Sequence, residues 1–279
     1  MSDAWSRLSE PLGQAFMQHA FTEVAIVGIL GGWLGCWVLL YGVSYSAESL
    51  SHGMFPGLVG ASLLGFPLVV GGAVGAGLAA LGIAGLGGVR GIDRDTSVGV
   101  VITSLFGLGA LLALAPDSPP GIQDLLFGDV LAVSRRDLLV TALIALPVLA
   151  LLWMLHQRLL AVGFDRSTAR AIGIAPRPVE LVVMLLVAAA VVASVQTLGS
   201  LLVVAVLVAP AACARLVTHR VGPMLCVSIA VAVAGGVAGL YLSYYAGTAG
   251  GASIALCLVG AYLLALGADA VRSSATHGV

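Results

Sequence analysis

Residues 221–245 read VGPMLCVSIAVAVAGGVAGLYLSYY, an apolar stretch that contains no Asp, Glu, Lys or Arg. A run of about 20 apolar residues is long enough to cross the roughly 30 Å hydrocarbon core of a bilayer as an α-helix. Because that core holds no water, the backbone must satisfy its hydrogen bonds within the segment, as a helix does. The stretch therefore predicts a membrane-spanning helix.

Comparable stretches recur along the whole chain, of which 60% is hydrophobic and only 9% is charged. Such a composition is far from that of soluble domains. We predict an all-α, polytopic transmembrane helical bundle of eight or nine spans, with nine favoured; the ambiguity is whether the second and third stretches form two spans or one broken unit. The candidate spans are residues 22–43, 48–66, 68–87, 95–115, 137–158, 177–194, 199–217, 221–245 and 250–270.

The N-terminal residues 1–21 carry an apolar pattern with helical spacing but no continuous apolar core. They are therefore not expected to be a cleavable signal peptide, and instead predict an amphipathic helix on the membrane surface. We divide the chain into this surface segment, residues 1–21, and a transmembrane domain, residues 22–279. The residues that carry the pattern are Trp5, Leu8, Leu12, Phe16 and Met17.

The arginines indicate the orientation, because short cytoplasmic loops are enriched in basic residues. Placing residues 158–177 in the cytoplasm puts most arginines on that side, together with the C-terminus. With nine spans the N-terminus then lies outside, and an even number of spans would reverse the N-terminus alone.

The cytoplasmic connection, residues 157–177, contains a short helical pattern from Asp165 to Ile172. Asp165 is a suitable N-cap and Gly173 a suitable C-terminal stop. A short capped helix in a protein with few loops suggests a docking element.

The external connection, residues 116–137, begins with a Pro- and Gly-rich turn and continues into a predicted short surface helix at residues 123–128. Asp129 follows this helix. Its carboxylate either holds the external loop in place or helps to bind a partner protein.

No nucleotide-binding, zinc-protease or serine-hydrolase motif occurs: G-x-x-x-x-G-K-[ST], H-E-x-x-H and G-x-S-x-G are all absent from the sequence. No basic tract suggests nucleic acid. We therefore expect a non-catalytic membrane protein that does not hold ATP phosphates itself.

Glu48 and His52 are the most informative polar residues within the predicted spans, because residues four apart share one helix face. Ionisable groups inside membranes commonly mark a transport pathway. Carboxylate and imidazole together suit Zn²⁺, Mn²⁺ or Fe²⁺. Two alternatives stay open: Glu48 caps the helix at the interface, and His52 hydrogen-bonds a carbonyl of a neighbouring helix.

Several motifs occur together in an order typical of one family. The chain resembles the permease subunits of zinc/manganese/iron ABC importers, the metal-uptake ABC-3 family, from about Phe16 to about Leu266. Glu48 stands where that family commonly has aspartate and is one methylene longer. The matching segments are ESLSH (48–52) with FPG (55–57), DTSVG (95–99), LFGDVL (126–131), the cytoplasmic segment 164–173, GSLL (199–202), and PAA (210–212) with AR (214–215).

The resemblance implies a homodimer of permease chains in the cytoplasmic (inner) membrane, with cytoplasmic ABC ATPase subunits and an external metal-binding protein as partners. Glu48 and His52 would bind zinc, manganese or iron transiently, and no cofactor would be held permanently. ATP would be used by the partner subunit. The residues implied in coupling to the ATPase are Phe164, Asp165, Ala169 and Gly173. The alternative is an ion-coupled secondary metal transporter or a channel-like membrane subunit.

Overall fold

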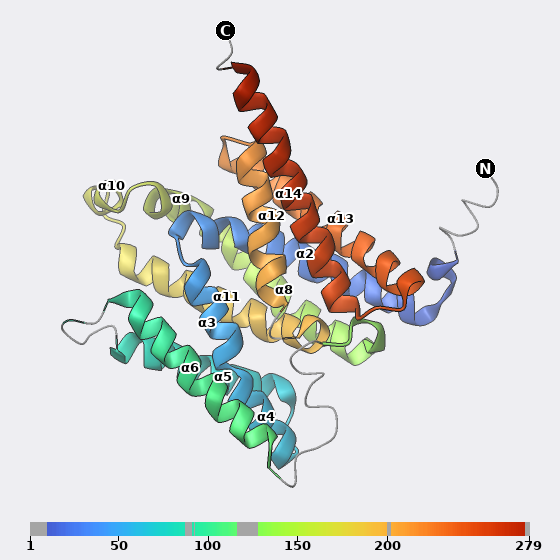
Figure 1. Ribbon diagram of the computed structural model, residues 1–279. Coiled ribbons are helices and arrows are strands. Elements are labelled where there is room, and N and C mark those ends of the chain that lie inside the picture. Colours follow the sequence, from blue (N-terminus) through green and yellow to red (C-terminus); the bar gives the residue numbers. More distant parts are fainter. Residues whose placement is uncertain (1–9, 87–90, 92, 116–127, 200–201, 277–279) are drawn as a thin grey trace.

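The computed structural model describes residues 10–86, 91, 93–115, 128–199 and 202–276, and every regular element in these ranges is a helix (Figure 1). The helices are η1 (Pro11–Gly13), α2 (Ala15–Tyr41), α3 (Ser44–Gly53), α4 (Phe55–Leu64), α5 (Leu68–Leu86), α6 (Arg94–Ala113), η2 (Val130–Ala132), α8 (Arg135–Met154), α9 (His156–Phe164), α10 (Arg166–Ala171), α11 (Pro176–Leu198), α12 (Val203–Val217), α13 (Val221–Ala246) and α14 (Gly250–Thr276).

Helix α2 lies at the centre of the bundle and packs against α8, α11, α12 and α13. In its most apolar window 67% of the residues are buried, against 11% in the peripheral α14. Glycines allow the close approach: a Cβ at Gly35 would overlap the carbonyl oxygen of Leu207 on α12, and one at Gly32 would lie 2.8 Å from Ile229 Cα on α13. Small residues at such contacts let helix backbones meet directly.

The predicted helical class is confirmed, but the expected eight or nine spans are wrong. Within the described residues, six helices are long and apolar enough to cross a membrane, and two more apolar helices, Leu68–Ile83 and Val203–Val217, are shorter. The six are Ala15–Tyr41, Asp95–Ala113, Arg135–Met154, Pro176–Val195, Val221–Ala246 and Gly250–Arg272.

The discrepancy arises because an apolar run need not form one straight helix. The predicted span 48–66 breaks between α3 and α4, each of 10 residues, which is about half the length that a span requires. Pro56 in the first turn of α4 has no N–H to donate, and its ring excludes the carbonyl of His52 from a regular helix. The predicted span 199–217 is likewise only 15 residues long as a helix.

The break between α3 and α4 is enclosed by α5 and α6. A Cβ at Gly75 of α5 would lie 2.6 Å from the carbonyl oxygen of Met54, and one at Gly109 of α6 would lie 2.5 Å from Phe55 Cδ1. Met54 itself is completely buried. This backbone-level packing fixes the end of α3, where His52 is located.

The N-terminal division of the chain stays a prediction. Trp5 and Leu8 lie outside the described residues, whereas Phe16 and Met17 belong to α2, which continues from Ala15 without interruption to Tyr41. Met17 is fully buried and Phe16 is 39% exposed.

Candidate functional site

Helix α3 brings Glu48 and His52 together, as their spacing predicts. His52 Nε2 lies 3.8 Å from Glu48 Oε1; the histidine side chain is 17% exposed and the glutamate side chain 47%. The pair thus combines a sheltered imidazole with a carboxylate that is open on one side.

Aromatic residues restrain the imidazole of His52. Its ring meets Phe106 of α6 edge to face, with centroids 5.8 Å apart and planes at 82°. Phe106 in turn stacks on Phe55, with centroids 5.5 Å apart. Because Phe55 opens α4, the broken helix and α6 together hold the ring in place.

The pair does not belong to a larger set of strong metal ligands. Among the described residues there is no group of three or more His, Cys, Asp or Glu side chains that could hold a metal ion. Glu48 and His52 are therefore a pair of candidate ligands and not part of a larger cluster among the described residues.

Helix α10 has the capped geometry that the sequence predicts at its start. The carboxylate of Asp165 accepts hydrogen bonds from the Ser167 N–H at 2.8 Å, the Ser167 hydroxyl at 2.7 Å and the Thr168 hydroxyl at 2.5 Å. The Thr168 hydroxyl, and after it the hydroxyl and N–H of Ser167, hold the pKa of the Asp165 carboxyl well below its usual range. The carboxylate is therefore charged at neutral pH.

The end of α10 turns sharply at Gly173, whose φ is +81°. Ala169 is fully buried, while Phe164 before the helix is 71% exposed. Arg166 pairs with Glu180 of α11 at 2.9 Å, which ties the segment to the bundle. The four residues that the family resemblance implies in coupling therefore lie in one small unit, in which Ala169 is buried and Phe164 is exposed.

A groove of about 460 Å³ adjoins this unit and is lined by Leu39, Leu40, Gly163, Phe164 and Arg215. It lies where the end of α2 meets α9 and α12, and Figure 1 shows α9 and α10 together at one end of the bundle. This end therefore has both a projecting aromatic side chain and a recess beside it.

Sequence reasoning missed a buried carboxyl group at Glu23, which is fully buried on α2. Thr141 of α8 donates its hydroxyl to Glu23 Oε1 at 2.8 Å, and this hydroxyl also lies 3.4 Å from the carbonyl oxygen of Ala193 on α11. The contact joins three helices inside the bundle. Its signal in the sequence was a lone charge in the first apolar stretch.

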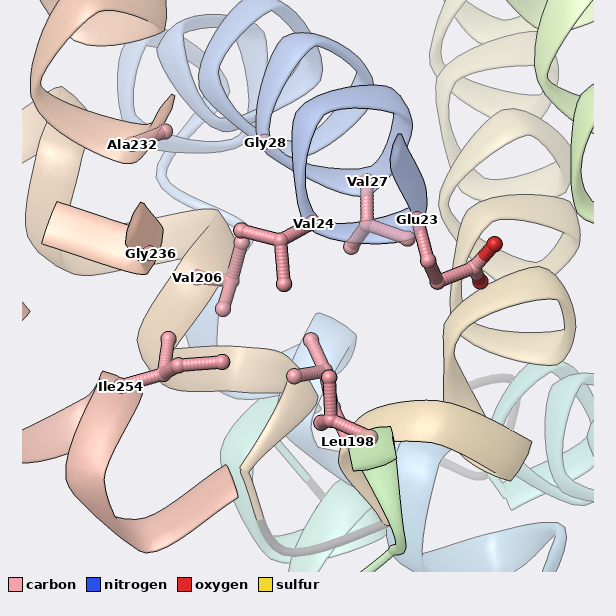
Figure 2. A pocket seen from close by; sticks show the side chains of 10 residues that line it. Glu23, Val24, Val27, Gly28, Leu198, Val206, Ala232, Gly236 and Ile254 are labelled. Carbon is pink, nitrogen blue, oxygen red and sulfur yellow. The ribbon is translucent and has the colours of Figure 1, made fainter. Parts of the chain in front are cut away.

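A cavity of about 10 Å³ lies beside Glu23, room for about one water molecule. Figure 2 shows the neighbouring side chains of Val24, Val27, Leu198 and Ile254, all of them aliphatic. The surroundings of Glu23 are thus mainly apolar, so its hydrogen bond to Thr141 matters for packing α2 against α8.

Asp129 caps the short helix η2. Its carboxylate accepts hydrogen bonds from the N–H groups of Leu131 at 3.1 Å and Ala132 at 3.2 Å. This favours the loop-holding interpretation of Asp129. The predicted surface helix at residues 123–128 lies almost entirely outside the described residues.

The bundle and its sparse internal charges are those of a multi-pass membrane protein. Within that class, the model of the ABC 3 transport family matches residues 13–268, and the chain belongs to this family. The family resemblance inferred from the sequence motifs is therefore confirmed.

Individual relatives match over nearly their full lengths. The chain is 35% identical over 257 residues to the manganese transport system membrane protein MntC of Halalkalibacterium halodurans, covering 92% of this chain and 88% of the relative. It is 33% identical over 265 residues to a probable iron transport system membrane protein of Haemophilus influenzae, covering 95% of this chain and 98% of the relative. It is also 33% identical to the chelated iron transport system membrane protein YfeC of Yersinia pestis, covering 89% of this chain and 85% of the relative.

Two solved structures have the same fold. PsaBC from Streptococcus pneumoniae, in complex with Fab, superposes with a TM-score of 0.86 at 30% identity, covering 94% of this chain and 95% of that one. A putative metal-chelate type ABC transporter in an inward-facing conformation gives a TM-score of 0.72 at 17% identity, covering 90% and 85%, which demonstrates the fold alone.

Proposed function

We propose that this chain is the membrane permease subunit of an ABC importer for a divalent transition metal, manganese or iron. The observation that carries the proposal is the match over almost the whole chain to relatives named for the transport of these two metals. Those relatives give no support for zinc, which the ligand chemistry alone would also allow. The metal is cargo, and we expect the chain to hold no permanent cofactor.

Glu48 and His52 form the proposed contact site for the cargo. Their 3.8 Å separation lets a carboxylate oxygen and an imidazole nitrogen approach the same ion after a small rotation of either side chain. A transport site must bind an ion strongly enough to admit it and weakly enough to release it. A two-ligand contact satisfies both requirements.

The proposed assembly is a homodimer of this chain in the cytoplasmic membrane, with ATPase subunits below and an external metal-binding protein above. Phe164, Asp165, Ala169 and Gly173 would form the contact that transmits ATPase closure to the bundle. The rigid cap at Asp165 and the exposure of Phe164 support this role. ATP hydrolysis takes place in the partner, and the permease itself is non-catalytic.

Reconstitution into proteoliposomes tests the function as a whole. We expect manganese uptake that requires the ATPase subunit and ATP, with iron competing if the two metals share the pathway. Family membership does not favour the alternative, an ion-coupled transporter or a channel-like subunit. Metal uptake by this chain alone, driven by an ion gradient and without an ATPase, would support that alternative and contradict the importer.

The proposed site is tested by Glu48→Ala and His52→Ala. Each change removes one of the two proposed ligands, so we expect manganese uptake to be abolished while the ATPase still co-purifies. His219→Ala is the control, because His219 is an exposed histidine between α12 and α13. Normal uptake in both site variants would show that Glu48 and His52 are packing residues.

A further inference from the structure

Two buried polar atoms on α3 have no hydrogen-bond partner in the described part of the chain: Ser49 Oγ and His52 Nδ1. Ser49 is completely buried. A buried polar group without a partner is costly, typically by about 1–3 kcal/mol. Two such atoms within one helical turn, beside the proposed metal contact, require an explanation.

The positions of Ser49 and His52 on the helix make these two atoms candidate hydrogen-bond partners of each other. Residues three apart on a helix are neighbours, with Cβ atoms roughly 5–6 Å apart. Helical side chains also lean toward the N-terminus, so the His52 ring lies over the turn that carries Glu48 and Ser49. Its Nε2 atom is the one near Glu48, which leaves Nδ1 as the nitrogen that Ser49 can serve.

The chemistry of metal-binding histidine supplies a reason for the pairing. An imidazole that binds a metal through one nitrogen donates the N–H of the other to an acceptor, which fixes both the tautomer and the ring orientation. A serine hydroxyl oxygen can accept such a bond. We propose that Ser49 is the positioning residue of the metal contact: when His52 Nε2 binds the ion, the Nδ1–H donates to Ser49 Oγ. This inference rests on the proposed function of His52.

Ser49 has the buried side-chain oxygen of α3 that makes no hydrogen bond among the described residues. Phe106 packs edge-on against the imidazole and offers it no hydrogen-bond acceptor of its own. Ser51, the other fully buried serine of α3, donates its hydroxyl to the carbonyl of Glu48 at 2.9 Å, and Ser46, which is also buried, lies six residues from His52. Ser49 Oγ is thus a buried oxygen of α3 that can accept the Nδ1–H bond which a metal-bound His52 would donate.

A matched pair of serine variants tests the proposal in the assembled transporter. Ser49→Ala and Ser51→Ala both delete a hydroxyl from a fully buried serine of α3. Loss of an outer hydrogen-bond partner of a metal ligand typically weakens binding by about 10–100-fold. We expect Ser49→Ala to weaken equilibrium binding of manganese by at least about tenfold, and to raise KM for uptake with little change in kcat. Ser51→Ala should leave both unchanged.

The His52→Gln background separates positioning from packing. If Ser49 acts through His52, then Ser49→Ala has no further effect on manganese binding once His52 is replaced. An equal additional loss in both backgrounds would overturn the proposal, as would equal effects of Ser49→Ala and Ser51→Ala.

The same measurements distinguish this proposal from the function on which it rests. Unchanged manganese binding in His52→Gln would remove the metal role of His52 and the present inference with it. Weakened binding in His52→Gln, combined with normal binding in Ser49→Ala, would overturn the positioning role alone and leave the proposed function intact.

Discussion

At the scale of single residues, the predictable contacts were those between near neighbours in sequence. Glu48 and His52 are four residues apart, so helix geometry alone predicted that they meet. Glu23 and Thr141 are 118 positions apart, and only the packing of α2 against α8 brings them together. Sequence reasoning therefore found the first pair and missed the second.

Thr141→Val should destabilise the bundle, because it leaves Glu23 Oε1 without the hydroxyl that donates to it. The expected loss is about 1–3 kcal/mol, typical of a buried polar group that loses one of its hydrogen bonds. Thermal unfolding of the detergent-purified chain measures it.

Thr103→Val serves as the control for that measurement. The Thr103 hydroxyl is exposed and donates to the Gly99 carbonyl of its own helix at 2.9 Å. A shift of the same size in both variants would mean that the bond to Glu23 has no special weight.

At the scale of elements, α10 was predictable because its signals are local. An aspartate N-cap, a short helical run and a glycine stop define it, and the structure has Asp165 as cap and a left-handed Gly173. The break between α3 and α4 was harder to predict, since Pro56 lies within an apolar run that is otherwise typical of one continuous span.

Replacement of the cap tests the coupling role of α10. We expect Asp165→Ala to raise the ATP hydrolysed per imported ion, because α10 loses three hydrogen bonds at its start. Asp165→Asn, which keeps a side-chain oxygen acceptor, should have a smaller effect. An unchanged ratio of ATP hydrolysed to ions imported in Asp165→Ala would show that the Asp165 cap is not needed for coupling.

The pH dependence of this cap follows from the lowered pKa of Asp165. A carboxyl whose pKa is lower in the folded state stabilises the protein above its unfolded pKa, near 3.9, and loses that effect as the pH falls toward the folded value. The contribution of the cap should therefore be constant near neutrality and decline only below about pH 4. Hydrogen exchange of α10 amides as a function of pH measures it.

Gly173→Leu should also disturb coupling, because φ of +81° is strained for a residue with a branched side chain. Gly173→Asn is the matched comparison, since asparagine tolerates left-handed backbone better. We expect ATPase co-purification to fall more in the leucine variant than in the asparagine variant. Equal retention in both would argue against a need for this turn.

At the scale of the whole molecule, the helical class was predictable and the number of spans was not. Composition identifies the solvent of a segment but not where its helix ends. Residues 48–66 and 199–217 are apolar enough to suggest spans, yet they contain helices of 10 and 15 residues. The contacts that shelter these short helices come from other elements: α5 and α6 pack against α3 and α4, and α2, α13 and α14 pack against α12.

The central packing of α2 gives a prediction at this scale. Gly35→Ala should destabilise the whole bundle by about 1–3 kcal/mol or more, because the added methyl group meets the Leu207 backbone. Gly77→Ala on α5, where a Cβ would meet nothing within 4 Å, should be neutral or slightly stabilising. Comparison of the two unfolding temperatures checks this, and a tolerated Gly35→Ala would contradict the close contact.

The interruption at Met54 and Phe55 also bears on how the chain is made. Neither half of the interrupted segment reaches the length at which a translocon recognises a span by itself. We therefore expect α3 and α4 to settle in the membrane only once α5 and α6, which pack against them, have been synthesised. We expect the region that carries Glu48 and His52 to enter the lipid together with α5 and α6, so a chain truncated after Leu64 should insert less completely than one that extends through α6.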